Sequence, residues 1–110
     1  MNSLMTMALK ESLERLDVVS GNNSRTRIEL DAIYKKHQDD IRTISRLISM
    51  ANDGKNTSEN KLDMIKDLES LMLSKQKDVG ELRKLLDYSE STSNELGKAR
   101  SWIKGTMETA

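Results

Sequence analysis

Hydrophobic residues between positions 25 and 51 recur in strict alternation of four-residue and three-residue steps. A repeat that averages 3.5 residues keeps one stripe of an α-helix facing a partner helix, which is the pattern of a coiled-coil seam. This pattern predicts a helix over residues 25–51, widened at its edges by Ile33, Leu47 and Met50. The predicted seam residues are Leu30, Tyr34, His37, Ile41, Ile44, Ile48 and Ala51.

The same alternation returns after residue 58 and predicts a longer helix over residues 58–104. Residues 89–94 are rich in Ser, Thr and Asn, which compete with a helix for backbone hydrogen bonds, so a break there is one alternative. The repeat keeps its phase across them, which favours a continuous helix. Its strongest positions are Ile65, Leu68, Met72, Val79, Leu82 and Leu86, with Lys75 and Ser89 as polar members and Leu96, Arg100, Ile103 and Met107 as the continuation.

Two clusters of Gly and Asn, residues 21–24 and 52–57, divide the chain into three segments. The first segment, residues 2–19, carries an apolar face that includes Leu9, Leu13 and Leu16. Gly21 suits the left-handed position that ends many helices. Thr26 and Glu29 stand at the spacing of a capping box, and so do Asn56 and Glu59, which predicts new helix starts after both clusters.

These segments predict an all-α fold with residues 1–110 as a single helical domain. We expect a three-helix antiparallel bundle or a helical hairpin with coiled-coil packing, in which the third helix is the longest. Composition agrees, because the 110 residues include no Pro, five Gly and only three aromatic side chains. Long helices are typical of such a chain, whereas a β-sandwich needs frequent turn residues.

Composition also excludes several functions. The chain has no Cys, so disulfides, thiol nucleophiles and Cys-ligated zinc sites are absent. Its 18 basic and 18 acidic residues give a net charge of zero, which argues against binding of nucleic acid by general electrostatic attraction. His37 is the only histidine, and with Asp40 it would lack the remaining ligands of a metal site. We therefore expect no enzyme activity, cofactor, metal, small-molecule substrate or stable membrane insertion.

In this three-helix interpretation the third segment is longer than the other two. Residues 86–107 are then an overhang without a partner helix in the same chain. An unpaired seam predicts a second copy of the chain, and we expect a homo-oligomer or another protein's helix there. The predicted function is a cytoplasmic, non-enzymatic protein–protein interaction module: an adaptor, an oligomerisation domain or a subunit of a coiled-coil complex. A regulatory domain of membrane-trafficking or fusion machinery, and a small secretion or folding chaperone, are the alternatives. The predicted interaction residues are Leu96, Trp102, Ile103 and Met107.

Overall fold

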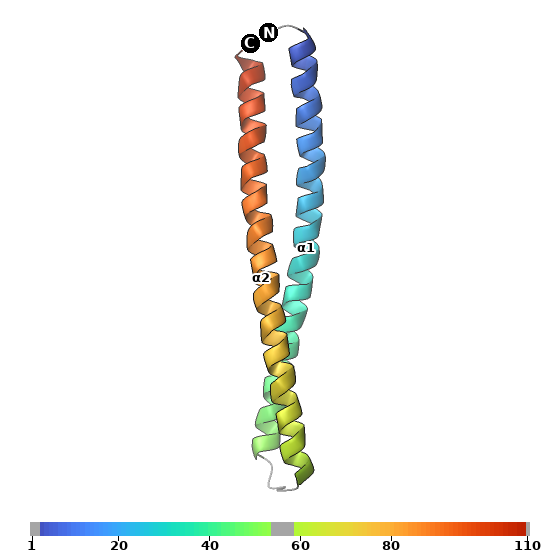
Figure 1. The fold of residues 1–110 in the computed structure, drawn as a ribbon, viewed down its shortest axis with the longest axis vertical. Coiled ribbons are helices and arrows are strands. Elements are labelled where there is room, and N and C mark those ends of the chain that lie inside the picture. The colour runs from blue at the N-terminus through green and yellow to red at the C-terminus, as the bar shows by residue number, and fades with distance from the viewer. Residues whose placement is uncertain (1–2, 54–58, 110) are drawn as a thin grey trace. The chain divides into compact units, whose positions relative to one another are not determined.

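The described residues of the chain form two long α-helices. A computed structural model describes residues 3–53 and 59–109, and all of these except Thr109 lie in α1 (Ser3–Asp53) or α2 (Glu59–Glu108) (Figure 1). The fold is therefore all-helical, but the three-helix bundle is wrong. The described residues of the first two predicted helices, 3–19 and 25–51, are parts of α1, and α2 contains residues 59–104 of the predicted third helix.

The missing break at Gly21 has a physical explanation. No described residue has a positive φ, so Gly21 is not a left-handed cap, and Thr26 and Glu29 lie inside α1 rather than at its start. The seam repeat crosses the cluster unbroken, through Ser20, Asn23 and Arg27, which are all half-buried. Packing of this stripe against a second helix stabilises α1. The free energy gained from this packing outweighs the cost of about 1 kcal/mol that a glycine adds to a helix interior.

α2 is also continuous through residues 89–94, the alternative that the retained repeat favoured. Ser89 is buried and Ser93 is half-buried, so the cluster contributes to the seam although its residues are poor helix formers. The predicted cap at Asn56 lies outside the described residues.

The helices pack in two compact units. Unit 1 comprises Met1–Glu29 and Leu86–Ala110, and unit 2 comprises Leu30–Leu85. In unit 1 the segments run antiparallel, because Asn23 of α1 contacts Ser89 and the earlier Asp17 contacts the later Arg100. Residues 86–107 therefore pair with the beginning of α1, and the predicted unpaired overhang does not exist.

Each unit buries little. Among the described hydrophobic residues, Ile44 in unit 2 is 6% exposed and Ile103 in unit 1 is 7% exposed, and these two form the buried core. Two paired helices cover only a narrow stripe of each other, so the other seam side chains keep an open edge. The half-buried members of the predicted seam include Leu30, Tyr34, His37, Ile41, Ile48, Ile65, Leu68, Met72, Val79, Leu82 and Leu86.

Candidate protein-interaction surface

The two edges of the seam differ in polarity on both helices. With seam positions named a and d in heptads from a to g, position g directly precedes a, and position e directly follows d. In α1 the g positions include Val19, Ile33 and Leu47, and in α2 they include Met64, Leu71, Leu85 and Ala99. The e positions carry mostly polar residues, such as Asp31, Gln38, Glu69 and Arg83. Each helix therefore has one apolar edge, which we call the g flank.

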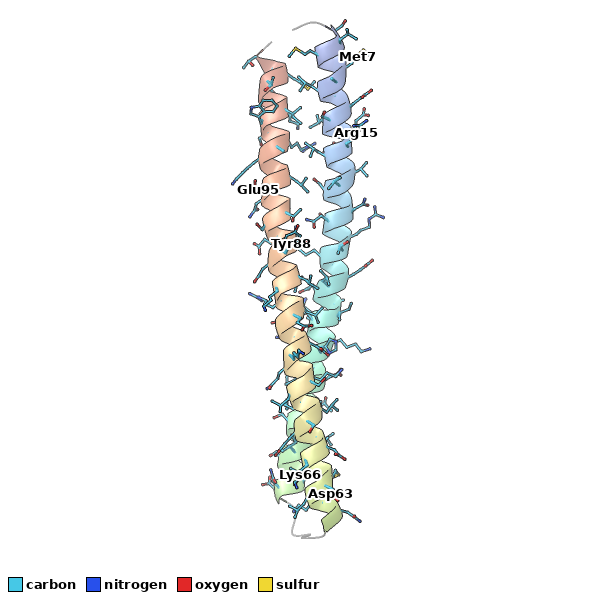
Figure 2. All side chains as sticks on the ribbon, viewed as in Figure 1. Met7, Arg15, Asp63, Lys66, Tyr88 and Glu95 are labelled. Atoms are coloured by element: carbon cyan, nitrogen blue, oxygen red, sulfur yellow. The ribbon has the colours of Figure 1, made fainter. Side chains whose placement is uncertain are left out.

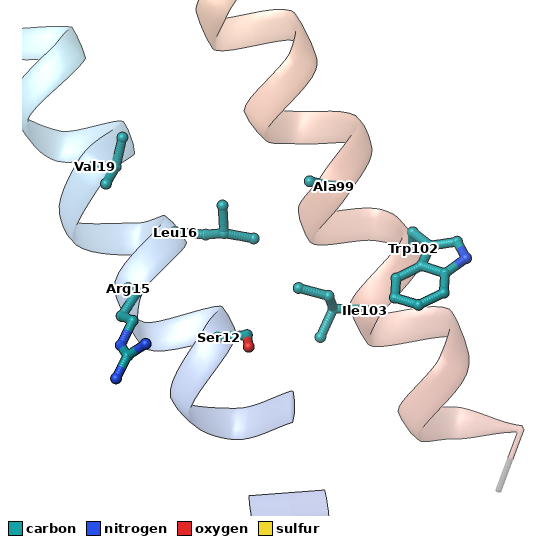
Figure 3. Close-up of a pocket in the computed structure, with 7 residues that line it drawn as sticks. All are labelled: Ser12, Arg15, Leu16, Val19, Ala99, Trp102 and Ile103. Carbon is teal, nitrogen blue, oxygen red and sulfur yellow. The ribbon is translucent and has the colours of Figure 1, made fainter. Parts of the chain in front are cut away.

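Antiparallel pairing brings the g flanks of the two helices to the same side of the seam. Reversing one helix places its g edge opposite the g edge of its neighbour. A pocket of about 510 Å³ in unit 1 shows this arrangement, because Ser12 and Val19 of α1 and Ala99 of α2, all at position g, line it together (Figure 3). The apolar edges thus combine into one surface in unit 1.

Seam and edge residues form different parts of this pocket. Leu16 and Ile103 point toward each other from the two helices, while Arg15 and Trp102 line the pocket from position c, which neighbours g on the helix surface (Figure 3). Trp102 is 67% exposed. A large aromatic side chain at the edge of an apolar pocket is the type of residue that dominates binding energy in protein interfaces.

The four predicted interaction residues occupy different environments. Ile103 is buried, Leu96 and Met107 are half-buried, and Trp102 is exposed. Leu96, Ile103 and Met107 lie at seam positions of unit 1, so they face α1 instead of an unpaired overhang. Sequence reasoning missed Val19 and Ala99, whose signal was their place directly before seam positions on both helices.

A polar pair sets the register of unit 1. The Asn23 amide Nδ2 donates a hydrogen bond to the Ser89 carbonyl oxygen at 2.9 Å, and Ser89 Oγ donates to Asn23 Oδ1, also at 2.9 Å. Ser89 is 4% exposed. Because both ends of the amide are engaged, a shifted helix pairing would leave these groups buried without partners. A seam Asn has this register-selecting effect in coiled coils.

Replacing Asn23 by Ala is expected to lower the free energy of unfolding by about 1–2 kcal/mol, because Ser89 Oγ loses its acceptor in a buried position. Urea denaturation followed by circular dichroism would measure this loss. Asn22→Ala is the matched control, since Asn22 is exposed and its Oδ1 accepts a hydrogen bond from Arg25, three residues further along the same helix. Equal stability of the two variants would contradict the role of Asn23.

His37 belongs to a polar cluster in the seam of unit 2. Lys75 Nζ donates to Asp40 Oδ2 at 3.1 Å and lies 3.3 Å from His37 Nδ1, which accepts in the tautomer protonated on Nε2. This cluster gives the polar seam residue Lys75 a partner from α1. Among the described residues, no group of three His, Cys, Asp or Glu side chains is arranged to hold a metal ion.

Several other charges form local pairs on the exposed faces of the helices. Lys35 and Asp31 are 2.9 Å apart, Lys98 and Glu95 are 3.4 Å apart, and Arg42 bonds Asp39. The hydrogen bond with Asp31, and then the charge of its carboxylate, raise the pKa of Lys35 above its ordinary 10.5. Exposed pairs of this kind contribute little to stability, so these charges serve mainly as a hydrated surface.

No protein-family model matches the chain, and neither a curated protein nor a solved structure shows significant similarity to it. Within the described parts of α1 and α2, neither helix contains an apolar stretch that could cross a membrane.

Proposed function

We propose that the chain is a non-enzymatic helical protein–protein interaction module that dimerises through the pocket of unit 1. The observation that carries the proposal is the apolar surface that the two helices leave uncovered. Among the described residues, 16 large hydrophobic side chains are between 45% and 76% exposed, against two that are buried. Uncovered apolar surface of this extent is typical of proteins that bind a partner.

The accessible area supports the same proposal. The chain exposes 8378 Å², whereas a compact monomer of its mass exposes about 6,200 Å². A protein interface of standard size removes roughly 800 Å² from each partner. The excess area is therefore sufficient for the interface with a second copy.

Charges around the pocket favour a second copy as its occupant. Arg15 of α1 and Glu95 of α2 both occupy position c of unit 1, and both are exposed (Figure 2). A two-fold axis across this surface would bring Arg15 opposite the partner's Glu95, and the reverse contact would follow by symmetry. The net charge of the chain is zero, so long-range repulsion does not oppose association.

Replacing Trp102 by Ala is expected to weaken dimerisation by about 2 kcal/mol, roughly 30-fold in Kd, because the largest exposed side chain at the pocket is lost. Light scattering over a concentration series gives the native mass and the Kd. In the parent chain, the emission of its single Trp should shift to shorter wavelength as the dimer forms. Ile28→Ala is the control, since Ile28 is 70% exposed at position b, away from the g flank.

A charge swap tests the orientation of the proposed dimer. Arg15→Glu alone should weaken association, and adding Glu95→Arg should restore it, because the swapped charges meet again across the axis. A parent chain that stays monomeric at every concentration would show that the pocket does not bind a second copy.

The proposal includes a cytoplasmic location. It rests on the cysteine-free composition, since small domains of secreted proteins commonly depend on disulfides.

A further inference from the structure

Two stretches that are poor in helix-forming residues lie side by side in unit 1. Residues 20–24 of α1 are Ser, Gly, Asn, Asn and Ser, and residues 89–94 of α2 consist of Ser, Thr and Asn with one Glu. Ser, Thr, Asn and Gly all favour a helix less than Leu, Lys or Glu do. Hydrogen bonds between Asn23 and Ser89 join the two stretches, although these residues are 66 positions apart. Helix propensity is therefore low in both helices at the same level of the pair.

The seam is also polar along these stretches. Three successive seam positions of α1 and two of α2 carry polar side chains that are buried or half-buried. They are Ser20, Asn23, Arg27, Ser89 and Ser93. We call residues 20–27 and 89–93 the polar section of unit 1. A seam without hydrophobic side chains gains little free energy from burial, so this section contributes little to the pairing of the helices.

Polar seam residues in unit 2 have a different setting. His37 and Lys75 occupy single positions, each between hydrophobic seam residues of its own helix. Lys75 also has Asp40 as a partner at 3.1 Å. The polar section of unit 1 therefore contains the longest run of polar residues in the described seam of each helix.

Arg27 is the residue of the polar section that the closed helix pair accommodates least well. It is half-buried, and its Nε atom is buried without a hydrogen-bond partner among the described residues. A buried N–H group that has lost water and gained no partner disfavours the closed pair, because local opening returns it to water. The hydrogen bonds of Asn23 and Ser89 fix the register of the closed pair without adding hydrophobic burial.

The helix pair beyond the polar section, toward the start of α1 and the end of α2, has contacts of its own. Ile103 is 7% exposed, and Leu16 points toward it from α1 (Figure 3). Asp17 Oδ1 and Arg100 Nε are 2.9 Å apart. The residues that line the pocket include none from the polar section. The section can therefore open while the pocket stays formed.

We propose that the polar section is an opening point built into unit 1, where α1 and α2 separate and lose helical structure locally while the pocket remains formed. Local opening occurs in the regions of a protein that have the fewest buried apolar contacts. The inference goes beyond the proposed function, because the opening occurs in the monomer and in the dimer alike.

Hydrogen–deuterium exchange of the whole chain, resolved by residue with NMR, tests the inference. Protection factors correct for the intrinsic exchange rate of each residue type. Residues 20–27 and 89–93 are expected to be about tenfold less protected than residues 13–16 and 96–103, although the latter lie nearer the helix ends. Fraying alone gives the opposite order, because protection then falls steadily toward the ends. That opposite order would overturn the inference.

Replacing Arg27 by Leu gives the decisive comparison. Leu and Arg have similar helix propensities, so the change acts on the seam and not on the helix itself. It adds a hydrophobic seam side chain and removes the buried Nε, so exchange of residues 89–93 on the facing helix should slow about tenfold. Residues 41–48 of unit 2 should keep the exchange rates of the parent.

Arg25→Leu is the matched control for this variant. Arg25 is the same residue type on the same helix, but it is exposed and its guanidinium donates to Asn22. Exchange of residues 89–93 should not change in Arg25→Leu. Unchanged exchange of these residues in Arg27→Leu, with helical content retained by circular dichroism, would contradict the opening point. Equal slowing in residues 41–48 would also contradict it, because exchange would then require global unfolding.

The two proposals fail separately, since light scattering tests the dimer and amide exchange tests the opening point. A parent chain that stays monomeric and shows the expected order of protection refutes only the dimer. A dimer whose polar section is as well protected as residues 13–16 and 96–103 refutes only the opening point.

Discussion

Replacing Ile44 by Ala is expected to lower the free energy of unfolding by about 2–4 kcal/mol, the range for truncating a buried aliphatic side chain. Ile44 is 6% exposed and is the one buried hydrophobic residue of unit 2 among those that the structure describes. With so few buried side chains, neighbouring residues offer little packing to compensate for the lost atoms. Urea denaturation, followed by the helical signal in circular dichroism, would measure the loss.

Ile28 provides the matched control for this experiment. It is the same residue type on the same helix, but it is 70% exposed. Ile28→Ala should change stability by no more than about 0.5 kcal/mol, as expected for a surface site. If Ile44→Ala and the parent unfold at the same urea concentration, the side chain of Ile44 contributes no packing energy.

Replacing Gly21, Gly80 and Gly97 together by Ala is expected to raise the free energy of unfolding by about 2–3 kcal/mol. All three lie inside α1 or α2, none has a positive φ, and an added Cβ would meet no atom within 4 Å. Each exchange removes the glycine penalty of roughly 0.8–1.0 kcal/mol in a helix interior. The three sites share no contacts, so their effects should add.

The single Gly21→Ala variant decides between the two folds considered for the first half of the chain. In the continuous α1, alanine stabilises the helix. In a three-helix fold, Gly21 would adopt a left-handed conformation that alanine tolerates poorly, and the variant would be less stable than the parent. The change in melting temperature caused by Gly21→Ala therefore has opposite signs for the two folds. A melting temperature below that of the parent would refute the uninterrupted helix.

Around Gly21, the phase of the seam repeat is a better guide to the structure than the turn-like composition of the segment. Residues 21–24 have the composition of a turn, yet Ser20, Asn23 and Arg27 continue the repeat from Leu16 to Leu30. At residues 89–94 the same argument from phase favoured a continuous helix, and α2 is continuous there. Polar residues in phase with a seam therefore indicate helix more strongly than local propensity indicates a turn, because tertiary packing supplies most helical stability.

The candidate interaction residues were only partly accessible to sequence reasoning. Trp102 was one of the predicted interaction residues, and it lies exposed at the pocket of unit 1. Val19 and Ala99 did not stand out, because each is an ordinary apolar residue in its own segment. Their significance depends on the pairing of α1 with α2, which joins positions 80 residues apart.

The helical class and the positions that face the seam follow from the sequence alone, because a 3.5-residue repeat is a local property of each segment. Three features could be seen only in the folded chain: residues 86–107 pair with the beginning of α1, Asn23 bonds Ser89, and the g flanks of the two helices share one side in unit 1. The physical reason is that heptad phase selects the face of a helix that is covered, whereas the direction and register of its partner depend on contacts between residues distant in the chain.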